Sequence, residues 1–370
     1  MRVYQTIHKY APHIPLFEKQ NNITNKTDIS FSELQKLILE DGYASSYILF
    51  PALEGRMEEV FFTLWDYERL QYLWAKEHGL KSRNLSVIKH AQIEWYKPDV
   101  FYNHSAFCDG DFVNKYRIDQ NILKVCWYGI IEQNPRLFKS YDIRLTLHRP
   151  YVKKWNDNGL KSYELQPAFD NRLEKHDSQH KTIDFLFYGQ CFHGMFNKRN
   201  QLIGELLEYG RNRKLNIKIH LQFGDLDKPY LDVPFFRRFK HDTNHSRFVK
   251  KYALPPLYGK SLYSTIGRSK FVINAYTDYN QHFKSNMRLF ESLGCGSLLI
   301  SEDGNYPDGF EANKNFLPYK YSKDLFENIP VYVDNYSLLK DNMLPYIDKV
   351  KNIYSKVNQW EQFKEIVYGI

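Results

Sequence analysis

One short segment near residue 290 constrains the fold of this chain more than any other part of the sequence. It begins with apolar residues at the spacing of one helix face: Met287, Phe290 and Leu293. Gly294 and Gly296 follow and end the predicted helix, since glycine is typical of helix C-termini. Residues 297–300 form an apolar run of strand length, and residues 302–304 have the composition of a turn. A helix that leads directly into a buried strand is half of an α/β unit.

The remainder of the chain repeats this alternation. Apolar runs of strand length occur at residues 3–7, 46–50, 60–64, 100–102, 123–127, 143–147, 183–188, 217–223 and 271–275. Amphipathic stretches separate many of them, and residues 30–33 match a capping box at the start of one predicted helix. Strands that alternate with helices predict an α/β protein with doubly wound sheets. At 370 residues, the chain is long enough for two domains, each with its own core.

Charge and cysteine content narrow the classes of function. The formal net charge of +8 suits a polyanionic partner: nucleic acid, an anionic membrane surface or a phosphorylated substrate. The four cysteines lie far apart and predict neither a metal site nor a disulfide framework. No apolar run is long enough to cross a bilayer, and the N-terminus lacks a signal core. We therefore expect a cytoplasmic protein, with peripheral membrane association left open.

The polar residues around the predicted helix at 287–294 indicate a binding site. Lys284, Asn286 and Arg288 crowd the helix start, where acidic residues suit the dipole better. Such donors beside free backbone N–H groups make a site for an anion such as phosphate. Glu291 follows one turn later and could accept two hydrogen bonds from a sugar diol. The alternative is a solvated helix start with a surface glutamate.

The segment from Asn286 to Leu299 also resembles a known signature. It resembles the nucleotide-sugar motif of glycosyltransferases that have two facing Rossmann-like domains, the GT-B architecture, and is closest to the CgeB-like group. A second stretch, from Tyr258 to Asn274, is similar to the same family. The resemblance implies that Glu291 binds the ribose hydroxyls and that Lys284, Asn286 and Arg288 face the diphosphate.

Further positions follow from this resemblance. It implies that Gly189 lets the donor phosphates approach the backbone, that Arg199 contacts them, and that Leu257 and Tyr258 pack on the nucleotide base. It also implies three segments: an acceptor-side domain at 1–170, a nucleotide-sugar-binding domain at 171–345, and a helical segment at 346–370 that crosses back to the first domain. The polar stretch 174–181 fits a linker between the two domains.

Histidines near the ends of predicted strands are candidates for a general base. His8 and His13 follow the first strand and His104 follows the strand at 100–102, although each could be an ordinary loop histidine. Asp109-Gly-Asp111 matches a metal-binding pattern, but Asp-Gly is common turn chemistry, and we interpret it as a turn. The resemblance to GT-B enzymes implies that no metal is bound, and we expect no metal and no cofactor.

The resemblance implies transfer of a sugar from a nucleoside-diphosphate sugar to an unidentified acceptor, without a metal. Many retaining relatives carry a second glutamate eight residues before the first, and Phe283 stands at that position here. Two alternatives stay open. The basic, aromatic insertion at 225–256 could bind nucleic acid, in a protein that binds or modifies it. A glycosyltransferase-like module could also bind a nucleotide sugar without catalysis.

Overall fold

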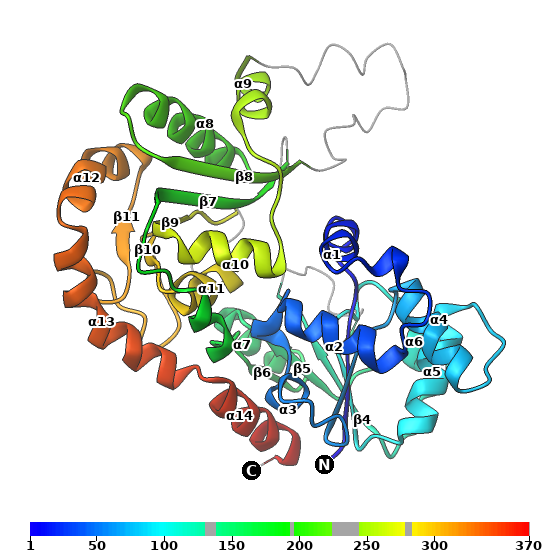
Figure 1. Ribbon diagram of the computed structural model, residues 1–370. Coiled ribbons are helices and arrows are strands. Elements are labelled where there is room, and N and C mark those ends of the chain that lie inside the picture. The colour runs from blue at the N-terminus through cyan, green and yellow to red at the C-terminus, as the bar shows by residue number, and fades with distance from the viewer. Residues whose placement is uncertain (130–137, 193–195, 224–243, 278–282, 370) are drawn as a thin grey trace, which may run out of the picture. The chain divides into compact units, whose positions relative to one another are not determined.

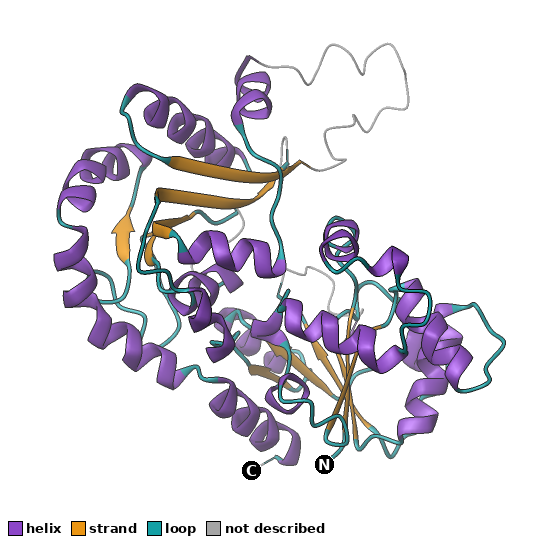
Figure 2. Cartoon of the chain, in the orientation of Figure 1, coloured by secondary structure: helices purple, strands orange, loops and turns teal. Residues whose placement is uncertain are grey.

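The structure is a computed structural model, and it describes residues 1–129, 138–192, 196–223, 244–277 and 283–369 (Figure 1). The chain divides into two compact units. The first unit comprises Met1–Ala168 together with Tyr354–Ile370, and the second comprises Phe169–Ile353. Each unit contains one parallel sheet accompanied by helices (Figure 2).

The first unit contains a six-stranded sheet in the order β2-β1-β3-β4-β5-β6. Its strands are β1 Val3–Ile7, β2 Val60–Leu64, β3 Val100–Asn103, β4 Leu123–Trp127, β5 Ile143–Thr146 and β6 Ser162–Glu164. Its α-helices are α1 Ile14–Gln20, α2 Phe31–Asp41, α3 Phe50–Leu53, α4 Glu68–Glu77, α5 Leu85–Tyr96, α6 Phe112–Lys115, α7 Arg149–Asp157 and α14 Lys356–Tyr368. Trp360, Phe363 and Ile366 of α14 belong to the core of this unit, so the end of the chain packs against residues far away in sequence.

The second unit contains a five-stranded sheet in the order β11-β10-β9-β7-β8. Its strands are β7 Ile183–Cys191, β8 Ile217–Phe223, β9 Ser269–Asn274, β10 Leu298–Glu302 and β11 Leu317–Tyr319. Its α-helices are α8 Asn197–Asn212, α9 Asn244–Tyr252, α10 Gly259–Gly267, α11 Met287–Gly294, α12 Ser322–Asp334 and α13 Tyr336–Ile353. The two parallel sheets confirm the predicted α/β class, because parallel strands need helical crossovers and are buried on both faces.

The strand predicted at residues 46–50 is wrong. A 3-10 turn, Ser45–Tyr47, and the short helix α3 occupy this region instead, with Pro51 in the first turn of α3. The side chain of Gln5 satisfies the backbone here, because it donates to the Tyr47 carbonyl at 2.9 Å and accepts from the Leu49 N–H at 3.0 Å. A side chain thus supplies the hydrogen bonds that a neighbouring strand would have made.

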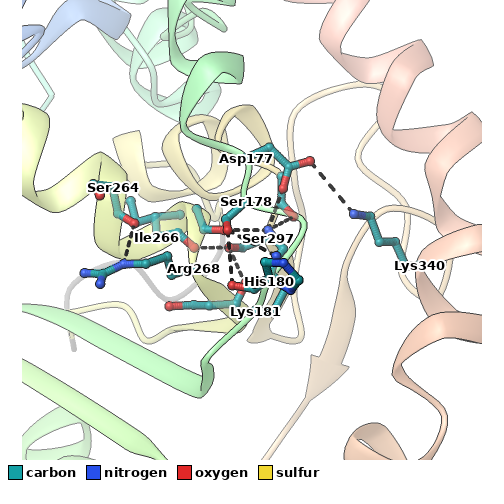
Figure 3. Close-up of polar contacts among 12 residues, drawn as sticks. Asp177, Ser178, His180, Lys181, Ser264, Ile266, Arg268, Ser297 and Lys340 are labelled. Carbon is teal, nitrogen blue, oxygen red and sulfur yellow. Dashed lines mark hydrogen bonds and ion pairs between the residues drawn. The ribbon is translucent and has the colours of Figure 1, made fainter.

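A buried lysine joins several loops of the second unit. Lys181 lies in the stretch 174–181, and its Nζ donates to Asp177 Oδ1 at 2.6 Å, to the Gly267 carbonyl at 2.7 Å and to the Gly296 carbonyl at 2.9 Å (Figure 3). Asp177 fits closely against Gly296, where a Cβ would lie 2.1 Å from the Asp177 Cγ. The stretch that composition suggests as a linker therefore fixes the C-terminal ends of α10 and α11.

Candidate functional site

The residues at the start of α11 meet the carboxyl ends of two neighbouring strands, β7 and β9. Arg288 donates from Nη1 to Asn274 Oδ1 at 2.6 Å and from Nη2 to the Tyr188 carbonyl at 2.5 Å. Asn286 donates to the same Asn274 oxygen at 2.9 Å. Since Asn274 ends β9 and Tyr188 lies near the end of β7, these bonds place the guanidinium group at the edge of the sheet.

This edge retains several unused hydrogen-bond donors. Arg288 has five N–H groups, of which two make the bonds given above, and its buried Nε has no partner among residues 1–129, 138–192, 196–223, 244–277 and 283–369. Over the same residues, the backbone N–H groups of Met287 and Arg288 bond to no backbone carbonyl outside their own helix. The first turn of α11 has no acidic residue, and the Asn286 side chain does not cap it. A fixed cation beside free N–H groups at a helix start is chemistry for binding an anion.

Gly189 is the point where the backbone comes closest to this guanidinium group. Its φ of +153° is a conformation that residues with side chains rarely adopt, and an added Cβ would lie 2.7 Å from Arg288 Nη2. The absence of a side chain therefore lets Arg288 reach the carbonyl of Tyr188.

We expect the substitution Gly189→Ala to displace Arg288 and to weaken binding of a diphosphate by about tenfold, the equivalent of one hydrogen bond to a charged group. Titration calorimetry with a nucleoside diphosphate measures this change. Gly159→Ala is the matched control, since Gly159 also has a positive φ but has nothing within 4 Å of the added Cβ. Equal affinity in wild type and Gly189→Ala would contradict the assignment.

Glu291 lies inside the second unit rather than on its surface. Its side chain is only 5% exposed, and Oε2 accepts a hydrogen bond from the Tyr188 hydroxyl at 2.8 Å. Burial raises the pKa of Glu291 above its usual range, while bonds from the Tyr188 and Tyr263 hydroxyls and the charge of Arg288 act in the opposite direction. A carboxylate oriented in this way retains lone pairs for further donors, such as a pair of sugar hydroxyls.

Lys284 and Arg199, the other predicted cations, have partners of their own. Lys284 is 6% exposed, and its ammonium group pairs with Glu302 Oε2 at 2.7 Å. Arg199 donates to the carbonyl of Gln190 at 2.6 Å, directly after Gly189, and lies 4.0 Å from the centre of the Phe196 ring. The structure thus joins Asn286, Arg288 and Glu291 through shared partners, whereas Lys284 and Arg199 add positive charge held by other groups.

Leu257 and Tyr258 precede α10. Tyr258 is the N-cap residue of that helix, and its hydroxyl donates to Gln222 Oε1, near the end of β8, at 3.0 Å. Leu257 is half-buried and packs against the core cluster that contains Tyr188. Both residues therefore lie at the same end of the sheet as Gly189.

The predicted general bases all lie in the first unit, in three different environments. His13 is buried, and its Nε2 lies 2.8 Å from Asp41 Oδ2. His104 is buried, and its ring stacks on Trp127 at a centroid distance of 4.1 Å. His8 is half-buried at the end of β1. Burial lowers the pKa of His104 to about 3, which argues against a role in accepting a proton.

The low pKa of His104 makes the stability of the first unit depend on pH. The unfolded chain binds a proton near pH 6.5 and the folded chain does not, so the free energy of unfolding falls as pH decreases from 6.5 toward 3. We expect wild type to lose about 1.4 kcal/mol per pH unit more than His104→Gln over the middle of this range, where the unfolded imidazole is protonated and the folded one is not. Urea unfolding at several pH values measures the difference, with the exposed His180→Gln as control. Parallel curves for wild type and His104→Gln would refute it.

Asp109 takes part in a buried ion pair. Its Oδ2 accepts hydrogen bonds from Lys89 Nζ and, at 2.9 Å, from Asn103 Nδ2, and the side chains of Lys89 and Asp109 are fully buried. Within the described parts of the chain, no group of three or more histidine, cysteine, aspartate or glutamate side chains is arranged to hold a metal ion.

Some residues that complete these sites were not predicted. Asn274 and Tyr188 orient Arg288 and Glu291, Ser105 contacts His8, and Asp66 follows β2 with a pKa raised by burial. Each lies within three residues of the carboxyl end of a strand. A systematic search for polar residues at these positions would have found them, since ligands bind at this edge of open α/β sheets.

Two further predictions concern the basic insertion at residues 225–256 and the lack of a membrane-spanning segment. Residues 225–243 of the basic insertion lie outside the described residues; of the remainder, residues 244–252 form α9. No described helix is both long and apolar enough to cross a membrane.

Comparison with known proteins gives the fold of the chain and the kind of domain that it carries. Residues 203–344 match a family model described as "Glycosyl transferase-like". The HepE protein of Anabaena, solved with UDP-glucose, has a similar fold, with a TM-score of 0.58, 10% identity and coverage of 100% of both chains. A glycosyltransferase from Rickettsia africae also has a similar fold, with a TM-score of 0.56 and 11% identity. The alignment covers 99% of this chain and 97% of that protein. This chain carries a glycosyl transferase-like domain and has the GT-B fold. No curated protein sequence matches it.

The glycosyl transferase-like domain contains most of the site described above. The matched residues run from α8 to α13 and include Asn274, Asn286, Arg288 and Glu291. Gly189 and Arg199 precede the matched range. These findings confirm the predicted GT-B fold and place a glycosyl transferase-like domain at residues 203–344, whereas the CgeB-like subgroup has no such support.

Proposed function

We propose that this glycosyltransferase moves a sugar from a nucleoside-diphosphate sugar to an acceptor, and that its second unit binds the donor. The observation that carries the proposal is the position of Arg288, held by Asn274 and by Tyr188 beside Gly189. HepE was solved with UDP and with UDP-glucose, which makes uridine diphosphate sugars the first donors to test.

In this proposal, Arg288, Asn286 and the start of α11 bind the diphosphate. Negative charge grows on the diphosphate as its bond to the sugar breaks, and fixed donors stabilise that charge without rearranging. The positive charges of Lys284 and Arg199 add to the stabilisation of the diphosphate without contacting it, and no metal ion is required. Asn286 contributes through its backbone and its amide at the N-cap position.

Glu291 binds the ribose in the same proposal. Its carboxylate accepts from the two ribose hydroxyls, while the hydroxyl groups of Tyr188 and Tyr263 fix its orientation. Leu257 and Tyr258 contact the nucleotide base, since they precede α10 at the same end of the sheet. A preorganised carboxylate loses little entropy on binding, which favours affinity.

Two measurements on the full-length protein test this function. A donor that binds only the folded state raises the melting temperature, so UDP, UDP-glucose and other nucleotide sugars are compared by thermal shift. Released UDP is then measured during incubation with the donors that bind. Release of UDP from a donor that binds supports a transferase, since water can replace the acceptor slowly and hydrolyse the donor. Binding without release favours a non-catalytic module, and no binding by any nucleotide sugar refutes the proposal.

A further inference from the structure

His8 and Ser105 form a contact at the carboxyl ends of two adjacent strands. β1 pairs with β3, so the residues that follow these strands lie side by side. The hydroxyl of Ser105 accepts a hydrogen bond from the backbone N–H of His8 at 2.5 Å, and lies 3.0 Å from His8 Nδ1. Over the described residues, Ser105 Oγ has no other hydrogen-bond partner.

The burial of Ser105 determines which atom carries the proton in this contact. Ser105 is fully buried, and a buried hydroxyl without an acceptor costs free energy comparable to a lost hydrogen bond. Its oxygen already accepts from the backbone of His8, so the hydroxyl proton needs an acceptor, and Nδ1 is the atom in reach. The Ser105 hydroxyl therefore donates to Nδ1, and neutral His8 carries its own proton on Nε2.

Further hydrogen bonds hold Ser105 in place. Its backbone N–H donates to Asn103 Oδ1 at 2.9 Å, and Asn103 Nδ2 in turn donates to Asp109 Oδ2 at 2.9 Å and to the Tyr141 hydroxyl at 2.6 Å. Lys89 completes the chain as the buried partner of Asp109. Because these groups lie in the core, the position of the Ser105 hydroxyl is fixed before any ligand binds.

We infer that His8 acts as a neutral hydrogen-bond donor, through Nε2–H, to a hydroxyl oxygen of a bound sugar, and not as a general base. Nε2 has no hydrogen-bond partner in the described chain and is not among its buried unpartnered atoms. Nδ1 has its lone pair engaged by Ser105, and Nε2 has none to offer in this tautomer. This inference rests on the proposed function, the transfer of a sugar. It assigns His8 of the first unit as a contact of that sugar.

The charged groups around His8 are consistent with a neutral ring. Burial lowers the pKa of His8, and Asp66, which follows β2, acts in the opposite direction. His104 also faces His8, and burial keeps it neutral. A neutral N–H donor suits a neutral hydroxyl, whereas a phosphate would favour the protonated ring.

The tautomer can be measured directly in the absence of any nucleotide. The full-length protein is labelled with ¹⁵N-histidine, and the His8 signals are assigned with His8→Gln. We expect a protonated Nε2 and an unprotonated Nδ1 at pH 8 in wild type, and a mixture of tautomers in Ser105→Ala. A protonated Nδ1 in wild type would overturn the inference, even if Ser105→Ala failed to fold. The tautomer is measured without a nucleotide sugar, so this test remains valid even if the protein binds no donor.

Kinetics then separate a donor from a base. Glutamine places an amide N–H near the position of Nε2, so His8→Gln should keep UDP release within about tenfold of wild type, and His8→Ala should lose more than His8→Gln. Loss of a general base instead costs about 100- to 10,000-fold in both variants and removes the pH dependence of that step. Equal losses of that size in both variants would overturn the assignment.

Discussion

Replacement of Arg288 by alanine is expected to lower kcat/KM for UDP release from a nucleotide sugar by about 100- to 1000-fold, the usual cost of removing a donor that stabilises charge in the transition state. The guanidinium group is held from β7 and β9 at distances of 2.5 and 2.6 Å, so its remaining donors are fixed in one orientation. Initial rates of UDP release measure the effect.

Two variants serve as controls for this prediction. Arg288→Lys keeps the charge but loses the planar donors that reach Asn274 and Tyr188 together, so it should recover only part of the activity. Arg268→Ala removes an exposed arginine of the same unit, whose Nε donates to the Ser264 carbonyl at 3.3 Å, and should leave the rate unchanged (Figure 3). Wild-type activity in Arg288→Ala would refute the proposed leaving-group site.

Replacement of Lys181 by methionine is expected to lower the free energy of unfolding of the second unit by about 3 kcal/mol, because it removes one partner of a buried ion pair. The side chain of Lys181 is only 5% exposed, and its ammonium joins Asp177 to the backbone carbonyls of Gly267 and Gly296. The Gly267 carbonyl would keep a hydrogen bond from the Ser178 N–H at 3.1 Å, whereas Asp177 would lose its buried partner. Lys340, 3.9 Å from Asp177 Oδ2, retains part of the charge balance. For a unit of this size the melting temperature should fall by about 6–12 °C.

Thermal unfolding with and without UDP measures this loss. Lys323→Met is the control, because Lys323 is 81% exposed and its pair with Glu327, at 3.7 Å, contributes little. If Lys181→Met unfolded like wild type, the buried contacts of Lys181 would not stabilise the ends of α10 and α11.

The sequence carries the parts of the site that depend on local order. Met287, Phe290 and Leu293 have helical spacing, and the helix they predict begins and ends close to α11. The position of Arg288 in the first turn follows from the same pattern. Local spacing also places Glu291 one turn later on that helix.

The partners of these residues depend instead on which strands are neighbours. Tyr188 and Asn274 meet Arg288 because β7 lies beside β9, although β8 intervenes in the sequence. Ser105 meets His8 because β1 pairs with β3. Periodicity does not encode strand order, so these contacts could not be predicted from it. The error at residues 46–50 has a similar cause, since Gln5, some 40 residues earlier in the chain, satisfies that backbone.

The most direct test of the account is whether Glu291 and the ribose hydroxyls interact. Titration calorimetry compares UDP with its 2′,3′-dideoxy analogue, in wild type and in Glu291→Ala, as a double-mutant cycle. Wild type should bind UDP at least about tenfold more tightly than the analogue, since the carboxylate accepts from both hydroxyls. In Glu291→Ala the two ligands should bind equally. The same preference for UDP in both proteins would contradict the central claim that the start of α11 binds a diphosphate while Glu291 holds its ribose.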